Sequence, residues 1–453
     1  MKFGSCCIIV FSRYPKPGET KTRLIPSLGA NGASRLQEQL TLHTLAKIQQ
    51  FQQATGCDAE LRFHGGTMDQ MRAIFGKSVA YHPQQGSCLG EKLATAIESC
   101  FARGYERLIV IGADCPEIGS SHFTSAFESL SNNDVVIGPA MDGGYYLLGL
   151  KRPHAQLFRG IDWGGPLVFR QTAAIAKRLG LRVKSLDQLP DVDYPEDLIH
   201  CRRLGQAFDS VLPKIRKHTV SVIIPTLNEA AQIEKAIRPL LAYQNIEIIV
   251  ADGGSSDRTA EIAEQTGATV VRSRPGRGTQ MNAGAAVSSG EILLFLHADT
   301  RLPEGFPDTA LNAVREGIGA AAFRLRIDGT SFGLRLVEFA VALRSKWLQR
   351  PYGDQGLAVR AEGFFRIGGF RNWPLMEDYE IANRLKTIGR ISLLEQSSTT
   401  SSRRWDHLGT ARTVLFNQLC VCAFRLGIPP AKLSTWYRRH TSPPKEADAV
   451  VTD

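Results

Sequence analysis

Gly290-Glu-Ile-Leu-Leu-Phe-Leu-His-Ala-Asp299-Thr300 is an apolar stretch that ends abruptly in a carboxylate. Its five consecutive apolar residues, Ile292 to Leu296, are typical of a strand that is buried on both faces of a sheet. Asp299 then emerges at the carboxyl end of that strand, where open α/β sheets bind their ligands. An Asp at such a place either binds Mg²⁺ or Mn²⁺ or only caps the next helix.

Three more polar clusters in the same half of the chain favour the first interpretation. Residues 220–229 predict a strand that runs into a polar loop, and residues 247–252 predict a second strand that ends in Asp. A Gly/Ser turn that opens a helix follows the second strand. Further on, the acids Glu377 and Asp378 stand just ahead of a helical stretch. Helix capping does not account for four such clusters in this order.

With these clusters, residues 219–440 resemble a family 2 glycosyltransferase of the GT-A fold. The resemblance implies that Asp378 is the base on the acceptor hydroxyl and that Asp299, the last residue of the Asp-x-Asp motif, binds the metal. His297 replaces the first Asp of that motif, and Ser401 replaces the Gln of the family's Gln-x-x-Arg-Trp. Residues implied for the nucleotide pocket are Thr226, Asn228, Glu229 and Asp252. Residues assigned to the acceptor site are Asp354, Gln355, Glu377, Arg404 and Trp405.

A basic loop that contains glycines, residues 270–284, also opens a helix. Because helix N-termini bind phosphate groups, Arg277 and Asn282 are predicted to contact the diphosphate or to keep the loop closed over it. Simple capping of the helix by Thr279 is the competing interpretation.

The first half of the chain repeats the pattern of strands that end in polar residues. A predicted strand at 7–11 leads into a Pro- and Gly-bearing loop whose cations suit a diphosphate or triphosphate. A second strand, 107–112, delivers Asp114 as the counterpart of Asp299, and Asp193 can join Asp114 on one cation. The predicted nucleotide-binding residues of this half are Lys16, Gly18, Lys21, Arg23, Asp142, Gly143 and Gly144.

Residues 5–205 resemble the cofactor-guanylyltransferase-like family related to 2-phospholactate guanylyltransferase. The matching stretches are the Pro-x-Pro-Gly-x-x-Lys-Thr-Arg-Leu loop at 15–24, Leu89-Gly-Glu91, Gly112-Ala-Asp-Cys-Pro, Asp142-Gly-Gly-Tyr145 and Asp191-Val-Asp193. The resemblance implies a nucleotidyltransferase-like Rossmann fold with a metal-bound nucleotide, although the glycine-rich first loop of sugar nucleotidyltransferases is absent. Members of both families are described as transferases linked to radical-SAM and arsenosugar pathways, and this chain resembles the two fused.

The composition of the chain agrees with two globular domains. A length of 453 residues exceeds what one hydrophobic core usually supports. The formal net charge of +10 favours anionic ligands or a lipid surface, and no basic and aromatic stripe indicates nucleic acid. Nine cysteines without a Cys-x-x-Cys pair favour a reducing cytoplasm over a disulfide framework. The sequence contains no run of 18 apolar residues, which is the length that predicts a membrane-spanning helix.

The expected fold class is α/β, with two Rossmann-like domains in tandem, each a mostly parallel sheet covered by helices. The expected boundaries are 1–205 for the nucleotidyltransferase-like domain, 206–218 for the linker, 219–440 for the glycosyltransferase domain and 441–453 for a disordered tail. An apolar stretch at 412–427, flanked by arginines, predicts a helix that either packs on its domain or lies on an anionic membrane surface.

The sequence therefore predicts a metal-dependent, inverting glycosyltransferase that uses Mg²⁺ or Mn²⁺. It would transfer a sugar from a nucleoside-diphosphate sugar to a small-molecule or lipid acceptor. Three alternatives stay open for the whole chain. The first half makes the donor that the second half uses, or it is a silent nucleotide-binding module, or the enzyme sits at the inner face of the cell membrane and glycosylates a lipid or carotenoid.

Overall fold

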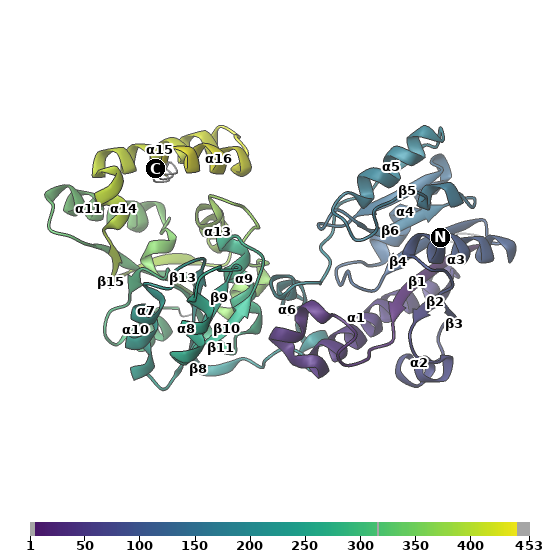
Figure 1. The fold of residues 1–453 in the computed structure, drawn as a ribbon, viewed down its shortest axis with the longest axis horizontal. Coiled ribbons are helices and arrows are strands. Elements are labelled where there is room, and N and C mark those ends of the chain that lie inside the picture. Colours follow the sequence, from purple (N-terminus) through teal and green to yellow (C-terminus); the bar gives the residue numbers. More distant parts are fainter. Residues whose placement is uncertain (1–4, 315–316, 442–453) are drawn as a thin grey trace, which may run out of the picture. The chain divides into compact units, whose positions relative to one another are not determined.

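Two helix-covered sheets, one in each half of the chain, make up the fold of the computed structural model, which describes residues 5–314 and 317–441 (Figure 1). The halves form two units, Met1–Leu212 and Pro213–Asp453. The predicted α/β class is confirmed for both. The stretch predicted to be a linker is partly regular, because β8 (Arg216–Thr226) already begins inside it. The predicted disordered tail lies outside the described residues, apart from residue 441.

The sheet of the first unit has the strand order β3-β2-β1-β4-β6-β5-β7. Strands β1 to β4 run parallel to one another, and β6 lies antiparallel between β4 and β5. The strands are β1 (Cys6–Arg13), β2 (Asp58–His64), β3 (Ala80–Pro83), β4 (Arg107–Gly112), β5 (Val135–Pro139), β6 (Tyr145–Leu150) and β7 (Val183–Ser185). The helices are α1 (Ile25–Thr55), α2 (Met68–Phe75), α3 (Leu89–Ala102), α4 (Ser120–Asn132), α5 (Val168–Arg178) and α6 (Leu198–Arg203).

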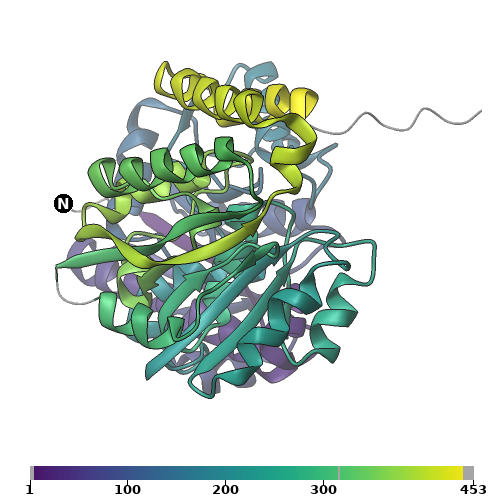
Figure 2. The same cartoon turned by 90° about the vertical axis from the view of Figure 1, so that its left-hand side faces the viewer.

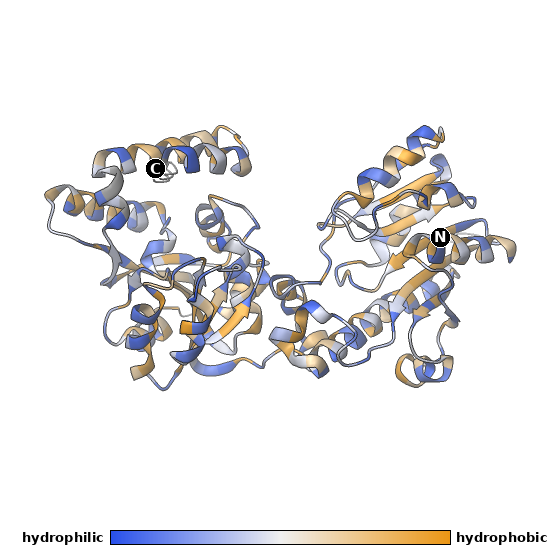
Figure 3. Cartoon of the chain, viewed as in Figure 1, coloured by the Kyte–Doolittle hydropathy of each residue, from blue (hydrophilic) through white to orange (hydrophobic). Residues whose placement is uncertain are grey.

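The continuous apolar run of β1 follows from helices on both faces of its sheet. Ile8 belongs to the hydrophobic cluster that includes residues of α1 and α4, whereas Ile9 belongs to the cluster that includes residues of α3 and α5. Neither side chain is accessible to solvent. A strand buried on both faces has no polar alternation, which is why the run is uniformly apolar. Figure 3 shows the strands of both sheets as hydrophobic.

The sheet of the second unit has the order β10-β9-β8-β11-β14-β13-β15-β12. Strands β8 to β11 are parallel, and β14 pairs antiparallel with both β11 and β13. Besides β8, the strands are β9 (Ile246–Asp252), β10 (Thr269–Arg272), β11 (Gly290–Phe295), β12 (Thr300–Arg301), β13 (Ile318–Asp328), β14 (Leu357–Arg360) and β15 (Arg390–Ser401). The helices are α7 (Ile233–Ile237), α8 (Thr259–Gln265), α9 (Arg277–Val287), α10 (Phe306–Ala313), α11 (Phe332–Leu348), α12 (Ala361–Arg366), α13 (Glu377–Leu385), α14 (Arg403–Leu408), α15 (Thr410–Arg425) and α16 (Pro430–Thr441).

The parallel parts of the two sheets share one topology, β3-β2-β1-β4 in the first unit and β10-β9-β8-β11 in the second. In each, the chain moves from the first strand toward one side of the sheet and then returns to pair on its other side. The strand order therefore reverses between β1 and β4, and between β8 and β11. Ligands of open α/β sheets bind in the crevice beyond the carboxyl ends of the strands at such a point.

Three helices complete the second unit beyond its sheet. Helix α11 packs on β13, and α15 contacts α11 and is followed by α16 (Figures 1 and 2). Within the described ranges, no helix combines the length and apolarity that crossing a membrane requires.

Candidate functional site

Two hydrogen-bonded loops form a rim where β8 and β9 end. The carboxylate of Asp252, 3% exposed, accepts hydrogen bonds from the backbone N–H groups of Gly254 and Ser255, each at 3.1 Å. Asn228 has a φ of +58° and holds the β8 loop against this turn. Its N–H donates to Ser255 Oγ at 2.9 Å, and its Oδ1 accepts from the Ser256 N–H at 2.8 Å. Asp252 and Asn228, both predicted for the nucleotide pocket, therefore lie side by side.

Gln280 of α9 ties the helix to both strand ends and was missed by the sequence analysis. Its Nε2 donates to the backbone oxygens of Thr226, at 2.6 Å, and of Ala251, at 3.0 Å. Gln280 is 5% exposed, and its neighbour Thr226 is 1% exposed. In the sequence, Gln280 is a single glutamine among small residues, and no motif or spacing marks it as functional.

Asp299 and Glu229 face a common cation beyond β11 and β8. The Arg403 Nη2 lies 3.9 Å from Glu229 Oε2 and 3.9 Å from Asp299 Oδ2. Burial raises the pKa of Glu229, and Asp299 adds to this although Arg403 opposes it. Two carboxylates that share one guanidinium keep a surplus of negative charge and offer hard oxygen ligands. This donor set fits a Mg²⁺ or Mn²⁺ ion.

Arg403 itself was not predicted, because the resemblance placed the functional arginine one residue later, at Arg404. The Arg404 side chain lies outside the described part of the structure. Trp405 packs against the hydrophobic cluster of β13 and α11 that contains Leu325 and Leu334.

Arg277 begins α9 and faces several acids. Its Nη1 lies 3.2 Å from Glu377 Oε1; Glu377 is 3% exposed, whereas the Arg277 side chain is half exposed. Partial removal from water lowers the pKa of Arg277, but nearby carboxylates outweigh this and raise it. These carboxylates are Glu377, Asp378, Asp299 and Asp354. One guanidinium thus lies among the predicted base, the predicted metal ligand and two predicted acceptor-site acids.

Asp378 lines a small cavity together with Arg277, His297 and Gly353. Helix α13 begins at Glu377, so the acids stand in its first turn and not ahead of it. The two oxygens of Asp378 accept from the N–H groups of Tyr379, at 2.7 Å, and Gly353, at 3.4 Å. A Cβ at Gly353 would lie 2.4 Å from His297 Nε2, so only glycine lets this backbone approach so closely.

Two other predicted residues are held by the protein itself. The Asn282 amide pairs with the backbone of Phe370 in both directions, at 2.8 and 2.9 Å. Gln355 is inaccessible to solvent, and its amide donates to Phe323 O at 3.0 Å and accepts from Ser345 Oγ at 3.0 Å. Both side chains fix the loops that carry the site, and their polar groups point into the structure.

A cleft of about 630 Å³ opens in the first unit at the carboxyl ends of β1 and β4. It is lined by the predicted Lys21, Arg23, Asp114 and Asp193. It is also lined by Arg13, another cation of the predicted phosphate-binding loop, and by residues that were not predicted, among them His64, Gln84, Ser87, Cys88 and Lys92. Burial lowers the pKa of His64, and the charges of Lys92 and Arg13 lower it further. The cleft therefore has a positive wall.

Lys21 lies between the two carboxylates that were predicted to share a metal. Its Nζ is 2.9 Å from Asp114 Oδ1 and 3.1 Å from Asp193 Oδ1, and it donates to Val192 O at 2.7 Å. The side chain is 5% exposed, and these carboxylates raise its pKa against the effect of burial. The three protons of the ammonium are thus all used. In this structure the cation shared by Asp114 and Asp193 is Lys21.

The remaining predicted residues of the first unit lie away from the lining of this cleft, so far as the described residues define it. Lys16 is 59% exposed and pairs with Glu19. Asp142 accepts a hydrogen bond from the Gly144 N–H at 2.7 Å within its own turn. At Gly143, with a φ of +95°, a Cβ would lie 2.0 Å from Pro166 O. The close approach at Gly143 is therefore made by the protein's own backbone and not by a ligand.

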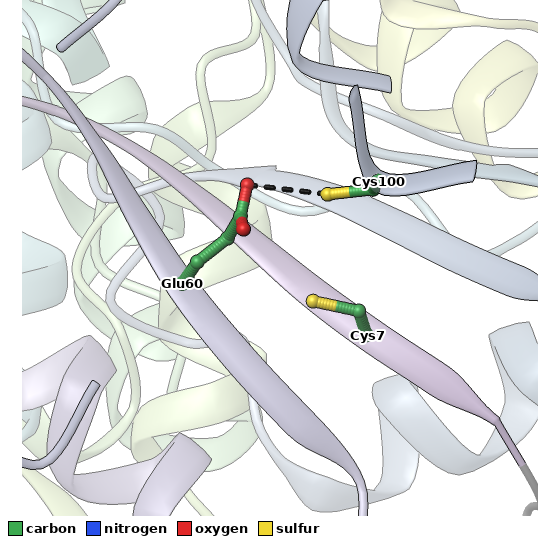
Figure 4. A group of neighbouring side chains, drawn as sticks. All are labelled: Cys7, Glu60 and Cys100. Carbon is green, nitrogen blue, oxygen red and sulfur yellow. Dashed lines mark hydrogen bonds between the residues drawn. The ribbon is translucent and has the colours of Figure 1, made fainter. Parts of the chain in front are cut away.

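Cys7, Glu60 and Cys100 form a separate buried group whose ligand atoms lie within 4.8 Å of one another (Figure 4). Cys100 Sγ donates to Glu60 Oε1 at 3.2 Å. The same carboxylate is paired with Arg62, at 2.6 Å, and with Arg103. Two guanidiniums already balance Glu60, so a further cation would be repelled, and we assign this group to the core of the unit.

Replacing Lys21 by Met is expected to destabilise the first unit by about 2 kcal/mol, because it leaves two carboxylates facing each other without their shared cation. The expected loss of stability is smaller than for a fully buried ion pair because the Asp114 side chain is 48% exposed. Hydrogen exchange of peptides from residues 5–212, measured in the full chain, reports the loss. Lys16→Met is the matched control and should change exchange little. Equal effects of the two substitutions would contradict the role given to Lys21.

Comparison with known proteins gives a family model for each half. Residues 45–165 match the family described as "Uncharacterized protein conserved in bacteria (DUF2064)", and residues 221–371 match "Glycosyl transferase family 2". The predicted fusion of two transferase-like domains is therefore confirmed at the level of domains.

Relatives with known names match parts of the chain. The 4,4'-diaponeurosporenoate glycosyltransferase of Staphylococcus haemolyticus is 31% identical over 28% of this chain and 36% of its own length. Glucosyl-3-phosphoglycerate synthase of Mycobacterium tuberculosis is 39% identical over 18% of this chain and 29% of its own. The chain thus spans about a third of the length of the curated relatives it matches.

Solved structures are similar over about half of the chain. A candidate nucleotide-diphospho-sugar transferase of Desulfovibrio desulfuricans G20 is 31% identical, with 46% of this chain and 90% of that chain covered and a TM-score of 0.41. Glucosyl-3-phosphoglycerate synthase of Mycobacterium tuberculosis, in complex with Mn²⁺, UDP and glucosyl-3-phosphoglycerate, is 24% identical. There the match covers 51% of this chain and 84% of that chain, with a TM-score of 0.31.

Proposed function

We propose that the second unit, whose residues 221–371 match the model of glycosyl transferase family 2, transfers a sugar from a nucleoside-diphosphate sugar to a hydroxyl acceptor. The observation that carries the proposal is the group of charged side chains around Arg277, which gathers Asp299, Asp378 and Glu377 beyond one edge of the sheet. The family match indicates sugar transfer, and this group offers a carboxylate for proton transfer, a carboxylate for a metal ion and a cation for a phosphate.

The rim formed by Asp252 and Asn228 is the proposed place of the nucleoside. The buried Asp252 carboxylate accepts the N–H groups of Gly254 and Ser255, so its role in this proposal is to fix the turn that faces the nucleoside. The diphosphate then lies toward the first turn of α9, where the backbone N–H groups and Arg277 favour negative charge.

Asp299 and the neighbouring Glu229 are the proposed metal ligands. Their carboxylates would hold a divalent cation, which would supply positive charge against the leaving nucleoside diphosphate. The Arg403 guanidinium lies 3.9 Å from both carboxylates and competes with such a cation for them. One relative was crystallised with Mn²⁺ and UDP, which supports testing this pair first.

Asp378 is the proposed general base. It accepts the proton of the acceptor hydroxyl while the hydroxyl oxygen attacks the anomeric carbon from the face opposite the leaving group, which inverts that carbon. The hydrogen bonds from Gly353 and Tyr379 orient the carboxylate. Arg277 lines the same cavity and would position the acceptor, and its pairing with Glu377 holds it there.

The acceptor is proposed to be a small phosphorylated or hydroxylated molecule, or a lipid. The matched relatives are named for acceptors of both kinds, a phosphoglycerate and a carotenoid acid. A panel of hydroxy acids, phosphorylated hydroxy acids and isoprenoid acids, each offered with UDP-glucose, would separate the two classes by UDP release.

The cleft of the first unit supports a second proposed function, which is binding of a nucleoside triphosphate. Its positive wall, formed by Arg13, Lys92 and Arg23, suits a chain of phosphates. Either Asp114 and Asp193 also hold a metal, in which case Lys21 must move aside, or Lys21 serves as their cation. Turnover of a triphosphate by this unit would make the chain bifunctional, whereas binding without turnover would make the unit a nucleotide-binding module.

Calorimetric titration of UDP, GDP and GTP with Mn²⁺ into the full chain tests both proposals. We expect Asp299→Ala to abolish binding of a nucleoside diphosphate, and Lys92→Gln to weaken binding of a triphosphate about tenfold. Lys77→Gln, at another exposed lysine of the first unit, is the control for the loss of one charge. Binding unchanged by Asp299→Ala would refute the metal site, and binding unchanged by Lys92→Gln would refute the cleft.

A further inference from the structure

Helix α11 exposes large apolar side chains along one whole face. Phe332, Leu336, Phe339, Leu343 and Trp347 recur every three or four residues and so share this face. Their exposed fractions run from 42% at Leu343 to 83% at Phe332, with Trp347 at 74%.

The opposite face of α11 is already occupied by its own unit. Leu334 and Val337 are buried there with Leu325 and Ile327 of β13. The helix therefore carries apolar side chains on two opposite faces. Among the described residues of the unit, only the face with Leu334 and Val337 is covered, so the face with Phe332 and Trp347 is available to a partner.

Helix α15, which contacts α11, repeats the pattern. Leu415, Leu419, Cys422 and Leu426, in the helix and at its C-terminal cap, stand at the same three- and four-residue spacing and are exposed, Leu426 at 84%. Each of these two helices in contact thus exposes a row of apolar side chains and not single residues, and such rows mark protein or membrane interaction sites.

The charge of these helices distinguishes between possible occupants. In the sequences of α11, α15 and α16, Glu338 is the one acid. The bases in the same three helices are Arg335, Arg344, Lys346, Arg412, Arg425, Lys432, Arg438 and Arg439. This excess accounts for much of the chain's formal net charge of +10. A second copy of the chain on a two-fold axis would place like charges against each other.

We propose that this face, formed by α11 and α15 with the cations of α16, docks the second unit on an anionic lipid surface. Phe339 and Trp347 enter the boundary between headgroups and acyl chains, and Lys346, Arg412 and Arg425 contact the anionic headgroups. The proposal goes beyond sugar transfer, and it holds whether the acceptor is a lipid or a soluble molecule.

Sedimentation of the full chain with vesicles tests the proposal without nucleotide or metal, so its failure is separate from any failure of the proposed activity. We expect binding to vesicles of phosphatidylglycerol and phosphatidylcholine, weaker binding at higher salt, and little binding to phosphatidylcholine alone. The double substitution Phe339→Gln with Trp347→Gln should weaken binding about tenfold or more. Leu241→Gln, at a leucine that is 50% exposed elsewhere in the unit, should change nothing.

Charge reversal on the same helices tests the contact with anionic headgroups independently of the apolar side chains. Lys346→Glu with Arg412→Glu should weaken binding to the anionic vesicles about tenfold, whereas Lys235→Glu on α7 should not. Equal binding by all variants would overturn the proposal. It would also be overturned if the wild-type chain fails to bind vesicles and light scattering shows a dimer that Phe339→Gln with Trp347→Gln dissociates, since the occupant is then a second copy.

Discussion

Replacing Asp378 by Asn is expected to lower the rate of sugar transfer by about three orders of magnitude. General base catalysis contributes roughly 10²–10⁴-fold, and an amide cannot take the proton of the acceptor hydroxyl. The amide oxygen can keep the 2.7 Å hydrogen bond from the Tyr379 N–H, so the first turn of α13 should keep its place, whereas the longer bond from the Gly353 N–H, which goes to the other oxygen of Asp378, is lost. The loss should therefore fall on kcat and leave the affinity for UDP nearly unchanged.

The measurement is the release of UDP from UDP-glucose with the best acceptor of the panel, together with the Kd of UDP and Mn²⁺ for the same variant. Glu380→Gln is the matched control on the same helix, because Glu380 pairs with Arg384 and does not line the cavity of Asp378. A variant Asp378→Asn that keeps more than a tenth of the wild-type kcat would remove Asp378 from the mechanism. A parallel loss of UDP binding would instead indicate damage to the fold of the site.

The strands that carry the site could be predicted because each has a local signature. Residues 107–112 were expected as a strand, and β4 has these bounds. The run around Ile292 is buried between helices on both faces of the sheet, which removes every polar residue from it. Within each sheet, the carboxyl ends of parallel strands lie at the same edge. The placement of Asp252 and Asp299 at that edge of the second sheet, and of Asp114 at that edge of the first, therefore followed from the strands alone.

The partners of these side chains could not be predicted, because they come from distant parts of the chain. Arg403 reaches Asp299 across about a hundred residues of sequence, and no local pattern distinguishes it from Arg404. Lys21 was predicted to bind the nucleotide from its loop, but its position between Asp114 and Asp193 depends on the pairing of three separate segments. Gly143 had a glycine-turn signature, and only the fold shows that Pro166 fills the space beside it.

The apolar face of α11 illustrates a different gap between sequence and structure. The sequence pattern of α11 is that of an ordinary amphipathic or buried helix, because periodicity alone does not show which face of a helix is covered. The arginine-flanked stretch at 412–427 predicted possible membrane contact, whereas residues 332–348, where the exposed aromatic residues lie, gave no such signal. Only the packing of Leu334 and Val337 on β13 shows which face of α11 remains uncovered.

Replacing Asp299 by Asn is expected to weaken Mn²⁺-dependent binding of UDP about a hundredfold, since the substitution removes one anionic ligand and leaves Glu229 as the remaining acid beside Arg403. Binding of Mn²⁺ alone, followed by electron paramagnetic resonance, should fall in the same variant. Arg403→Gln should have the opposite effect on Mn²⁺ alone, because a competing cation 3.9 Å from both carboxylates is lost.

The control for Asp299→Asn is Asp308→Asn, an exposed acid in the first turn of α10, which should bind UDP and Mn²⁺ as the wild type does. The opposite responses of Asp299→Asn and Arg403→Gln separate metal binding from simple damage to the fold, since damage would weaken Mn²⁺ binding in both. If neither substitution changes the affinity for Mn²⁺, the metal does not bind at Asp299. The charge balance of this site would then have to come from Arg403 and Arg277, and the transferase would hold its diphosphate through guanidinium groups alone.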